Sequence, residues 1–460
     1  MRSALSVLSV LSVGSVLRHR TYRRLFVAQV VALLGTGLAT VALGLLAYDL
    51  AGADAAAVLG TALALKMCAY VAVAPLAAAL ATRVPRRTLL VCADFVRACA
   101  ALTLPLVDQV WQIYGLILLL QAASATFTPV FQATVPDVLP EERAYTEALS
   151  LSRLAYDLES LLSPVLAAGL LALVPYTWLF TGTAAGFLAS GLLVLSVALP
   201  RPPAPDTTYP HPAGRRPRAG LGVRLFLATP RLRALLALDL AVAAAGALVL
   251  VDTVVLVRDT LGRPTGDVPL ALGAYGAGSM GVALLLPRLL DRLDERRLML
   301  AGAFALPAVL APLALFLAAP PGAWSWPGLL AAYLLVGAAT SAVLTPSGRL
   351  LRRSAASGDL PAVFAARFSL SHACWLLTYP LAGLLATHAG PAPTAAVLAA
   401  VALLATLAAA RLWPRTDPVA LAHAHPELPA DHPHLAGAAG PHTHAFHIDA
   451  LHRRWPAPAP

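Results

Sequence analysis

Residues 298–318 read LMLAGAFALPAVLAPLALFLA, an apolar stretch without a single charge. About 20 apolar residues in a helix cross the hydrocarbon core of a bilayer, where every backbone polar group must be bonded within the segment. Further stretches of this kind occupy most of residues 25–413. The twelve expected spans are 25–47, 56–80, 88–107, 111–133, 149–172, 176–199, 234–257, 268–290, 298–318, 326–345, 363–388 and 392–413.

The composition also indicates a membrane protein. The chain of 460 residues is 59% hydrophobic and 12% charged, whereas about a quarter of the residues in a soluble domain are charged. All four cysteines lie inside expected spans, so the sequence indicates no disulfide framework. We expect an all-α polytopic membrane protein. An enzyme is disfavoured, because the sequence shows no nucleotide-binding loop, catalytic triad spacing or zinc-protease motif.

The distribution of arginine predicts the orientation in the membrane. Positive residues accumulate in cytoplasmic loops, and arginines cluster before the first span, after the second, eighth and tenth spans, and in the proline-rich linker 200–232. The alternate loops carry mainly aspartate. We therefore expect both termini and the linker in the cytoplasm of a bacterial cell, with the spans in its inner (plasma) membrane. The net charge of +10 then reflects topology rather than binding of nucleic acid.

The chain is expected to consist of five parts, with a linker between two membrane-spanning halves. They are a segment 1–24, a six-span half 25–199, the linker 200–232, a second six-span half 233–413 and a tail 414–460. The halves are weakly similar: the loop after span two reads ATRVPRR, and the loop after span eight reads LDRLDERR. Two six-span halves with basic loops at these places resemble the major facilitator superfamily. The resemblance implies a cavity between the halves and alternating access by rocking; we expect a monomer.

In that superfamily an Asp-Arg followed by two basic residues helps to latch the cytoplasmic helix ends. The second half keeps this signature, whereas in the first half Thr82 stands where the aspartate belongs and Pro85 where a glycine is usual. Asp94 and Arg97 offer an alternative pair. The expected gate consists of Arg83, Arg86, Arg87, Asp94, Arg97, Asp291, Arg292, Arg296 and Arg297. Span five contains LSPVLAAG, which resembles a degraded Gly-Pro-x-x-Gly-Gly element of drug–proton antiporters.

Charged residues inside spans are candidates for substrate contact or proton coupling, because charge in hydrocarbon is costly. They are Lys66, Arg153, Asp157, Glu159, Asp239, Asp252 and His372. Lys66 is the one lysine of the chain and lies near the middle of its span, so it either pairs with a carboxylate or titrates. Arg153 and Asp157 are four residues apart and should form an intrahelical pair.

Glu159 points away from that pair and has no evident local partner, so it is the first candidate for a proton carrier. Asp239 lies close in sequence to Arg231 and Arg233, which are expected to cap it, and Asp252 should be solvated at the outer end. Arg367 should extend to the cytoplasmic face. His372 is either a proton relay or a polar packing residue.

The tail is rich in histidine. Eight of the twelve histidines lie between 423 and 452, largely as His-x-His pairs, among prolines that exclude a stable helix. Clustered imidazoles on a flexible segment bind divalent metals. The expected ligands are His423, His425, His432, His434, His442, His444 and His447. The other interpretation is a low-complexity extension without a role.

A transporter with such a tail resembles the NreB-type nickel-resistance permeases, as do the runs TPVFQATVPD at 128–137 and SLSRLAYD at 150–157. The resemblance implies proton-driven efflux of Ni²⁺ or Co²⁺. No resident cofactor is expected; Ni, Co or Zn on the tail would be substrate or regulator, and the bilayer and protons would be the other partners. Two alternatives stay open. They are an exporter of drugs or macrolide-like molecules, and a non-transporting metal sensor.

Overall fold

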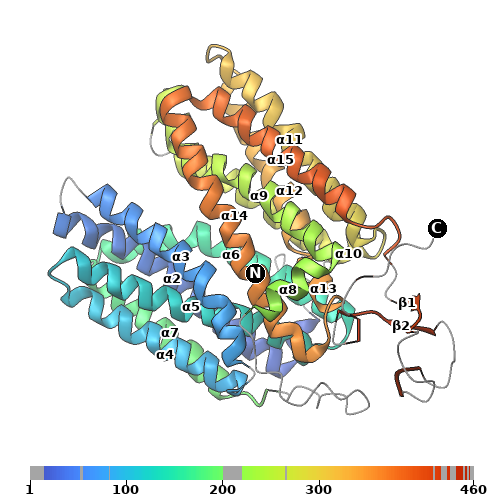
Figure 1. Ribbon diagram of the computed structural model, residues 1–460. Coiled ribbons are helices and arrows are strands. Elements are labelled where there is room, and N and C mark those ends of the chain that lie inside the picture. The colour runs from blue at the N-terminus through green and yellow to red at the C-terminus, as the bar shows by residue number, and fades with distance from the viewer. Residues whose placement is uncertain are drawn as a thin grey trace.

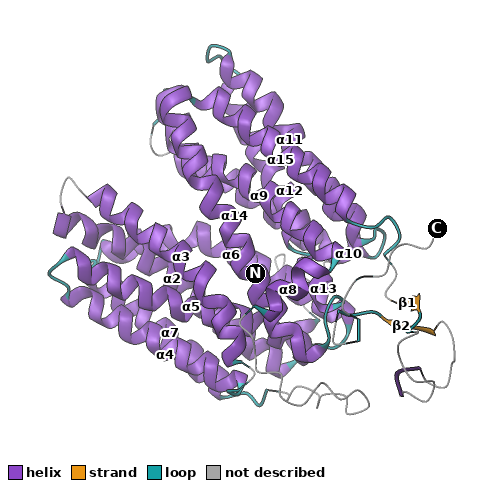
Figure 2. Ribbon diagram, in the orientation of Figure 1, coloured by secondary structure: helices purple, strands orange, loops and turns teal. Residues whose placement is uncertain are grey.

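The chain folds almost entirely into helices, with one small sheet near its carboxyl end (Figure 2). A computed structural model describes residues 15–51, 55–81, 83–199, 220–264, 267–417, 420–425, 433–435, 442–448, 451–452 and 455. Thr82, His432, residues 200–219 of the linker and residues 1–14 of the first segment lie outside the described residues.

Twelve long helices in the described residues correspond to the twelve expected spans. The first half contains α2 (Arg20–Ala51), α3 (Ala55–Leu80), α4 (Arg86–Thr103), α5 (Val110–Val138), α6 (Glu142–Leu171) and α7 (Thr177–Leu195). The second half contains α9 (Pro230–Val255), α10 (Val268–Leu290), α11 (Glu295–Ala318), α12 (Ser325–Leu344), α14 (Leu360–Ala389) and α15 (Pro391–Leu412). The expected all-α fold with twelve spans is therefore confirmed.

Shorter elements connect these helices. They are η1 (Val16–Arg18), η3 (Leu104–Leu106), α8 (Leu221–Ala228), η4 (Leu256–Thr260), α13 (Ser347–Arg352), η6 (Ser357–Asp359), β1 (Ala420–His423), η7 (Pro433–Leu435) and β2 (His442–Ala445). Within the described residues, ten helices are long and apolar enough to cross a membrane. In α3 the apolar stretch covers Ala64–Ala77, and α6 carries several charged residues along its length. The chain is a multi-pass membrane protein.

The two halves form separate bundles that meet at one end of the molecule (Figure 1). That end carries α8, α13 and the β1–β2 sheet, and the bundles diverge away from it. The loops α3–α4, α5–α6 and α10–α11 also belong to it, because successive spans run in opposite directions. We call it the basic end, since the arginine clusters of the sequence fall in these connections.

Helices α10 and α12 approach each other closely through two glycines. A methyl group at Gly278 would overlap the carbonyl oxygen of Leu334, and one at Gly337 would overlap the carbonyl oxygen of Tyr275. Small residues permit such contacts between membrane helices, where dispersion forces rather than hydrophobic burial hold the helices together. The second half therefore depends on these two glycines for its packing.

We expect Gly278→Ala to lower the thermal unfolding temperature of the purified protein, because α12 must move to accept the methyl group. Overpacking of this kind destabilises by about 1–3 kcal/mol. The control is Gly281→Ala on the same helix, where the added methyl group meets nothing within 4 Å. The control should unfold at or slightly above the wild-type temperature. Equal unfolding temperatures for the two variants would contradict the close approach.

Candidate functional site

A cavity of about 170 Å³ lies between the two halves near the basic end. Helices α2, α5 and α6 line it from the first half, and α12, α13 and α14 line it from the second half. Its polar lining residues are Gln29, Gln132, Tyr145, Ser152, Arg153, Tyr156, Thr345, Ser347 and Arg367. The cavity therefore lies where the two halves meet.

Arg153 links the halves beside this cavity. Its Nη2 atom lies 3.0 Å from the Asp157 carboxylate, the intrahelical pair that the spacing indicates. Its Nε atom also donates a hydrogen bond of 2.9 Å to the Ser279 hydroxyl on α10. Arg153 therefore joins α6 of the first half to α10 of the second half, which the sequence alone did not indicate.

Asp239 pairs with Arg367 and not with the arginines near it in sequence. The Nη2 atom of Arg367 lies 3.2 Å from the Asp239 carboxylate, and the Asp239 side chain is 2% exposed. Arg367 therefore does not extend to the cytoplasmic face as expected. The reason is that α14 packs beside α9, so the two charges meet inside the second half.

Asp252 is also buried, and the expectation that it is solvated is wrong. It is 2% exposed. The next residue, Thr253, hydrogen-bonds to the Tyr333 hydroxyl at 2.8 Å, which places this part of α9 against α12. The Oδ2 atom of Asp252 has no hydrogen-bond partner among the described residues. Asp252 does not line the cavity between the halves.

Two other expected coupling residues, Lys66 on α3 and His372 on α14, meet at the ring of Tyr70. The Lys66 Nζ atom lies 5.6 Å from the centre of the Tyr70 ring, and His372 on α14 packs edge-on against that ring at 4.7 Å. The charge of Lys66 acts on both Glu159 and His372. Glu159 was expected to have no local partner; the Lys66 charge that acts on it comes from another helix, α3.

The residues expected to form the gate act within their own halves. Arg86 pairs with Asp137, and the buried pair Asp94–Arg97 is local to α4. Arg296 donates to the Trp413 carbonyl at 3.4 Å. Two further arginines also make contacts within their own half: Arg87 donates to the Leu195 carbonyl, and Arg297 pairs with Asp294. Arg83, Asp291 and Arg292 are exposed.

Residues of α13 join the halves instead. Arg349 lies 2.9 Å from the Glu295 carboxylate in its own half, and it also pairs with Glu142 of α6 in the other half. It donates a further hydrogen bond of 3.0 Å to Thr146 Oγ1. Arg352 donates to the Pro140 carbonyl across the same boundary. We call these four contacts of Arg349 and Arg352 the α13 latch. Only the clustering of arginine at 349–353 hinted at it.

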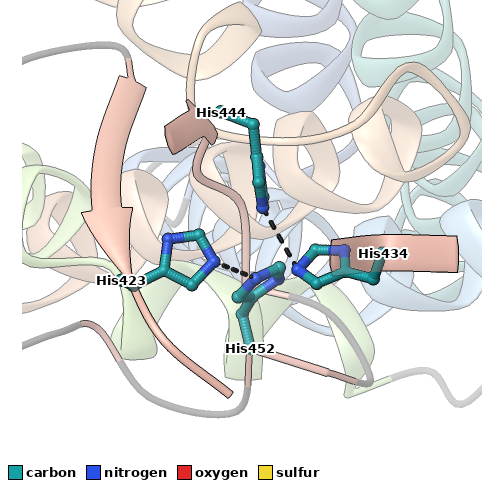
Figure 3. A group of neighbouring side chains, drawn as sticks. All are labelled: His423, His434, His444 and His452. Carbon is teal, nitrogen blue, oxygen red and sulfur yellow. Dashed lines mark hydrogen bonds between the residues drawn. The ribbon is translucent and has the colours of Figure 1, made fainter. Parts of the chain in front are cut away.

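The tail brings six histidines together. β1 and β2 pair antiparallel with His423 opposite His442, so the expectation of a flexible tail is wrong for this part. Two groups of four have ligand nitrogens within 4.8 Å of one another: His423, His434, His444 and His452, and His423, His425, His434 and His442. Figure 3 shows the first group converging from separate segments.

The geometry of the first group suits a metal ion. The Nε2 atoms of His423 and His452 are 2.9 Å apart, and those of His434 and His444 are 3.2 Å apart. Four nitrogens at about 2.0–2.1 Å from a tetrahedral ion lie roughly 3.3 Å from one another. His452 belongs to this group although it was not among the expected ligands. His447 was expected but belongs to neither group.

The protonation state of the cluster also suits metal binding. Burial, together with the charges of the neighbouring histidines, lowers the pKa of His434 from 6.5 to about 4. Burial lowers the pKa of His423 in the same way. Neutral imidazole is the form that binds metal, so these two side chains are in their ligating form at neutral pH.

The tail is docked on the basic end of the second half. Phe446 and Ile448 are buried in the main hydrophobic cluster of that half, and the Trp455 ring lies 4.9 Å from the Arg231 guanidinium. Asp417 pairs with Arg231 at 3.0 Å and with Arg353. Arg353 lies 3.4 Å from Glu295, which also holds Arg349. A chain of ion pairs therefore connects the start of the tail to the α13 latch.

Two six-helix bundles with a cavity between them indicate a transporter rather than an enzyme. The family model of the Major Facilitator Superfamily matches residues 25–330 and 270–432, and the chain belongs to this superfamily. No curated protein matches the chain.

Solved structures share the fold. A bacterial homologue of the iron transporter ferroportin, outward-facing, has a TM-score of 0.71 at 14% identity and covers 85% of this chain and 99% of its own. A human organic anion transporter has a TM-score of 0.69 at 15% identity and covers 85% and 99%. The fucose:proton symporter of E. coli has a TM-score of 0.66 at 16% identity and covers 85% and 98%.

Proposed function

We propose that this chain is a proton-coupled secondary transporter that exports a divalent metal, with nickel and cobalt as the first candidates. The observation that carries the proposal is the histidine cluster of the tail, whose nitrogens converge at ligand-like separations. The cluster sits on the basic end beside the α13 latch, so metal held there is close to the entrance that the latch closes. By affinity alone Cu²⁺ would bind such a site more tightly, which leaves the choice of metal to experiment.

In this proposal the basic end faces the cytoplasm of a bacterial cell, because arginine-rich connections are retained on that side. In the described form the contacts of the α13 latch are formed, so this form is then closed to the cytoplasm. Export requires the latch to open, accept the substrate and close again, as in the rocking of two halves around a fixed site. We further propose that the chain works as a monomer, without a resident cofactor and without nucleic acid.

Glu159 is the proposed proton carrier. It lies inside the membrane on α6, and the charge of Lys66 on α3 acts on it. A carboxylate beside a lysine holds or releases its proton according to how closely the two approach. Movement of α3 relative to α6 would therefore change the proton affinity of Glu159, which is what coupling requires.

The test is nickel and cobalt accumulation in a metal-sensitive bacterial host. Four strains are compared: the intact chain, a chain ending at Asp417, the Glu159→Gln variant and the empty vector. The truncated chain keeps the ion pairs of Asp417 with Arg231 and Arg353, but it loses the packing of Phe446, Ile448 and Trp455 together with the cluster. We expect the intact chain to lower cell metal, truncation to restore it partly, and Glu159→Gln to match the vector.

The same strains separate the alternatives. Equal metal content in all four would overturn metal export and favour an organic substrate. If truncation alone abolished every effect and Glu159→Gln had none, the chain would be a metal sensor. The drug-exporter alternative is disfavoured by the size of the cavity, about 170 Å³, because sites for drug-sized molecules enclose roughly 300–1,000 Å³.

A further inference from the structure

The charged groups of the cavity between the halves are all basic. Among the described residues that line it, the ionised side chains are Arg153 and Arg367, and no carboxylate is present. Asp157 and Asp239 form ion pairs with these two arginines, but neither aspartate lines the cavity. A bare divalent cation would therefore meet two guanidinium groups and no oxygen ligand of opposite charge, which is the reverse of a metal site.

Two donors at this cavity also lack a partner. The Tyr145 side chain is 1% exposed, and its hydroxyl has no hydrogen-bond partner among the described residues. The same holds for the Nε atom of Arg367. Buried polar groups in proteins are almost always hydrogen-bonded. Two buried donors left open at one cavity indicate that a ligand with acceptor atoms completes them.

The neighbouring backbone leaves room for the hydroxyl. Gly348 of α13 lines the cavity, and a methyl group at this glycine would lie 2.7 Å from the Tyr145 hydroxyl oxygen. Residues from both halves thus shape one small space, in which polar groups stand among apolar ones. Arg153 and Tyr145 come from α6, whereas Arg367 and Gly348 come from α14 and α13. A ligand held by them would touch both moving bodies.

We propose that this cavity is a binding site for a small organic polycarboxylate, held by Arg153, Arg367 and the Tyr145 hydroxyl. Guanidinium groups recognise carboxylates through parallel hydrogen bonds. The proposal rests on the transport function proposed above and names the form of its substrate. The metal would leave as an anionic carboxylate complex. The same chemistry also fits a free carboxylate, and the experiment below distinguishes these two sources.

The probe is citrate, titrated into the purified full-length protein by calorimetry. Citrate should bind the wild type, and Tyr145→Phe should weaken binding by about tenfold. This variant removes a hydroxyl without a partner, so a purely structural role predicts no loss of stability. The double variant Arg367→Gln/Asp239→Asn removes both members of an ion pair, leaves no unpaired charge in the core, and should abolish binding.

The matched control is Arg263→Gln/Asp267→Asn, which neutralises an ion pair of 2.6 Å outside the cavity. It should bind citrate like the wild type. Absence of citrate binding in the wild type, or unchanged affinity in both Tyr145→Phe and the Arg367 double variant, would overturn the proposal. If the Arg367 double variant does not fold, Tyr145→Phe decides alone.

Nickel–citrate and citrate are then compared in the His423→Ala/His434→Ala variant, whose tail no longer competes for the metal. Tighter binding of nickel–citrate identifies the complex as the ligand, and tighter binding of citrate identifies the free carboxylate. The accumulation test is independent of this result. Export of nickel without citrate binding would overturn the proposed anion site but not metal export. Citrate binding without nickel export would overturn metal export but not the anion site.

Discussion

Replacing His423 and His434 together with alanine should reduce the nickel affinity of the purified protein by at least about a hundredfold. These two residues belong to both groups of four, so their loss leaves at most two ligands in either group. Even changes to groups that merely support a ligand lower metal affinity by about 10–100-fold. The measurement is nickel titration of the full-length protein, with bound metal quantified after desalting.

Two single variants test whether nickel binding depends on the folded arrangement of the histidines or only on their number. His452→Ala should weaken nickel binding, because His452 Nε2 lies 3.2 Å from His425 Nε2 and 2.9 Å from His423 Nε2. His447→Ala should leave it unchanged, because His447 belongs to neither group. Both remove one histidine from the same tail, so total histidine content is matched. The opposite ranking of the two variants would mean that the described arrangement is not the one that binds metal.

The affinity should also depend on pH in a defined window. The pKa of His434 falls from 6.5 to about 4 in the folded cluster. Between these values the unfolded tail binds a proton that the folded cluster does not, so folding of the cluster loses stability as pH falls. Nickel affinity should therefore be constant above about pH 6.5 and decrease steadily towards pH 4.

The second large effect is expected at Arg349→Gln, which should open the basic end. Arg349 contacts Glu295 in its own half and both Glu142 and Thr146 in the other half. The pair with Glu295 lies within one half, so the contacts that hold the closed form are those with Thr146 and with Glu142, whose side chain is 66% exposed. An exposed ion pair contributes about 0–1 kcal/mol, and a hydrogen bond to a charged group contributes about 1.5–3 kcal/mol. Losing both, about 2 kcal/mol together, shifts the ratio of closed to open molecules by roughly thirtyfold. Transport turnover should fall as a result.

The measurement is the distance between spin labels across the basic end. Labels at Glu141 and Asp291, both exposed, report the separation of the halves in a background without the native cysteines. Arg297→Gln is the matched control, since it removes an arginine of the expected gate whose side chain is 75% exposed and pairs only locally with Asp294. Exposed pairs contribute about 0–1 kcal/mol. Identical distance distributions for Arg349→Gln and the wild type would rule out the latch.

The sequence alone was sufficient for the twelve spans. An apolar stretch of membrane length is a local property, and in hydrocarbon a helix satisfies its own backbone wherever its neighbours lie. The same reasoning applies to the intrahelical pair of Arg153 and Asp157, whose spacing sets its contact. The concentration of histidine in the tail was likewise evident from composition.

The partners of the charged residues depended on tertiary structure. Asp239 is eight residues from Arg231 but pairs with Arg367, 128 residues away, because a buried carboxylate takes the cation on the helix packed beside it. The buried Glu295 meets Arg349 of α13 for the same reason. His452 joins His423 through a fold of the tail rather than through a repeat. Sequence determined which segments enter the membrane, and packing decided which of their charges meet.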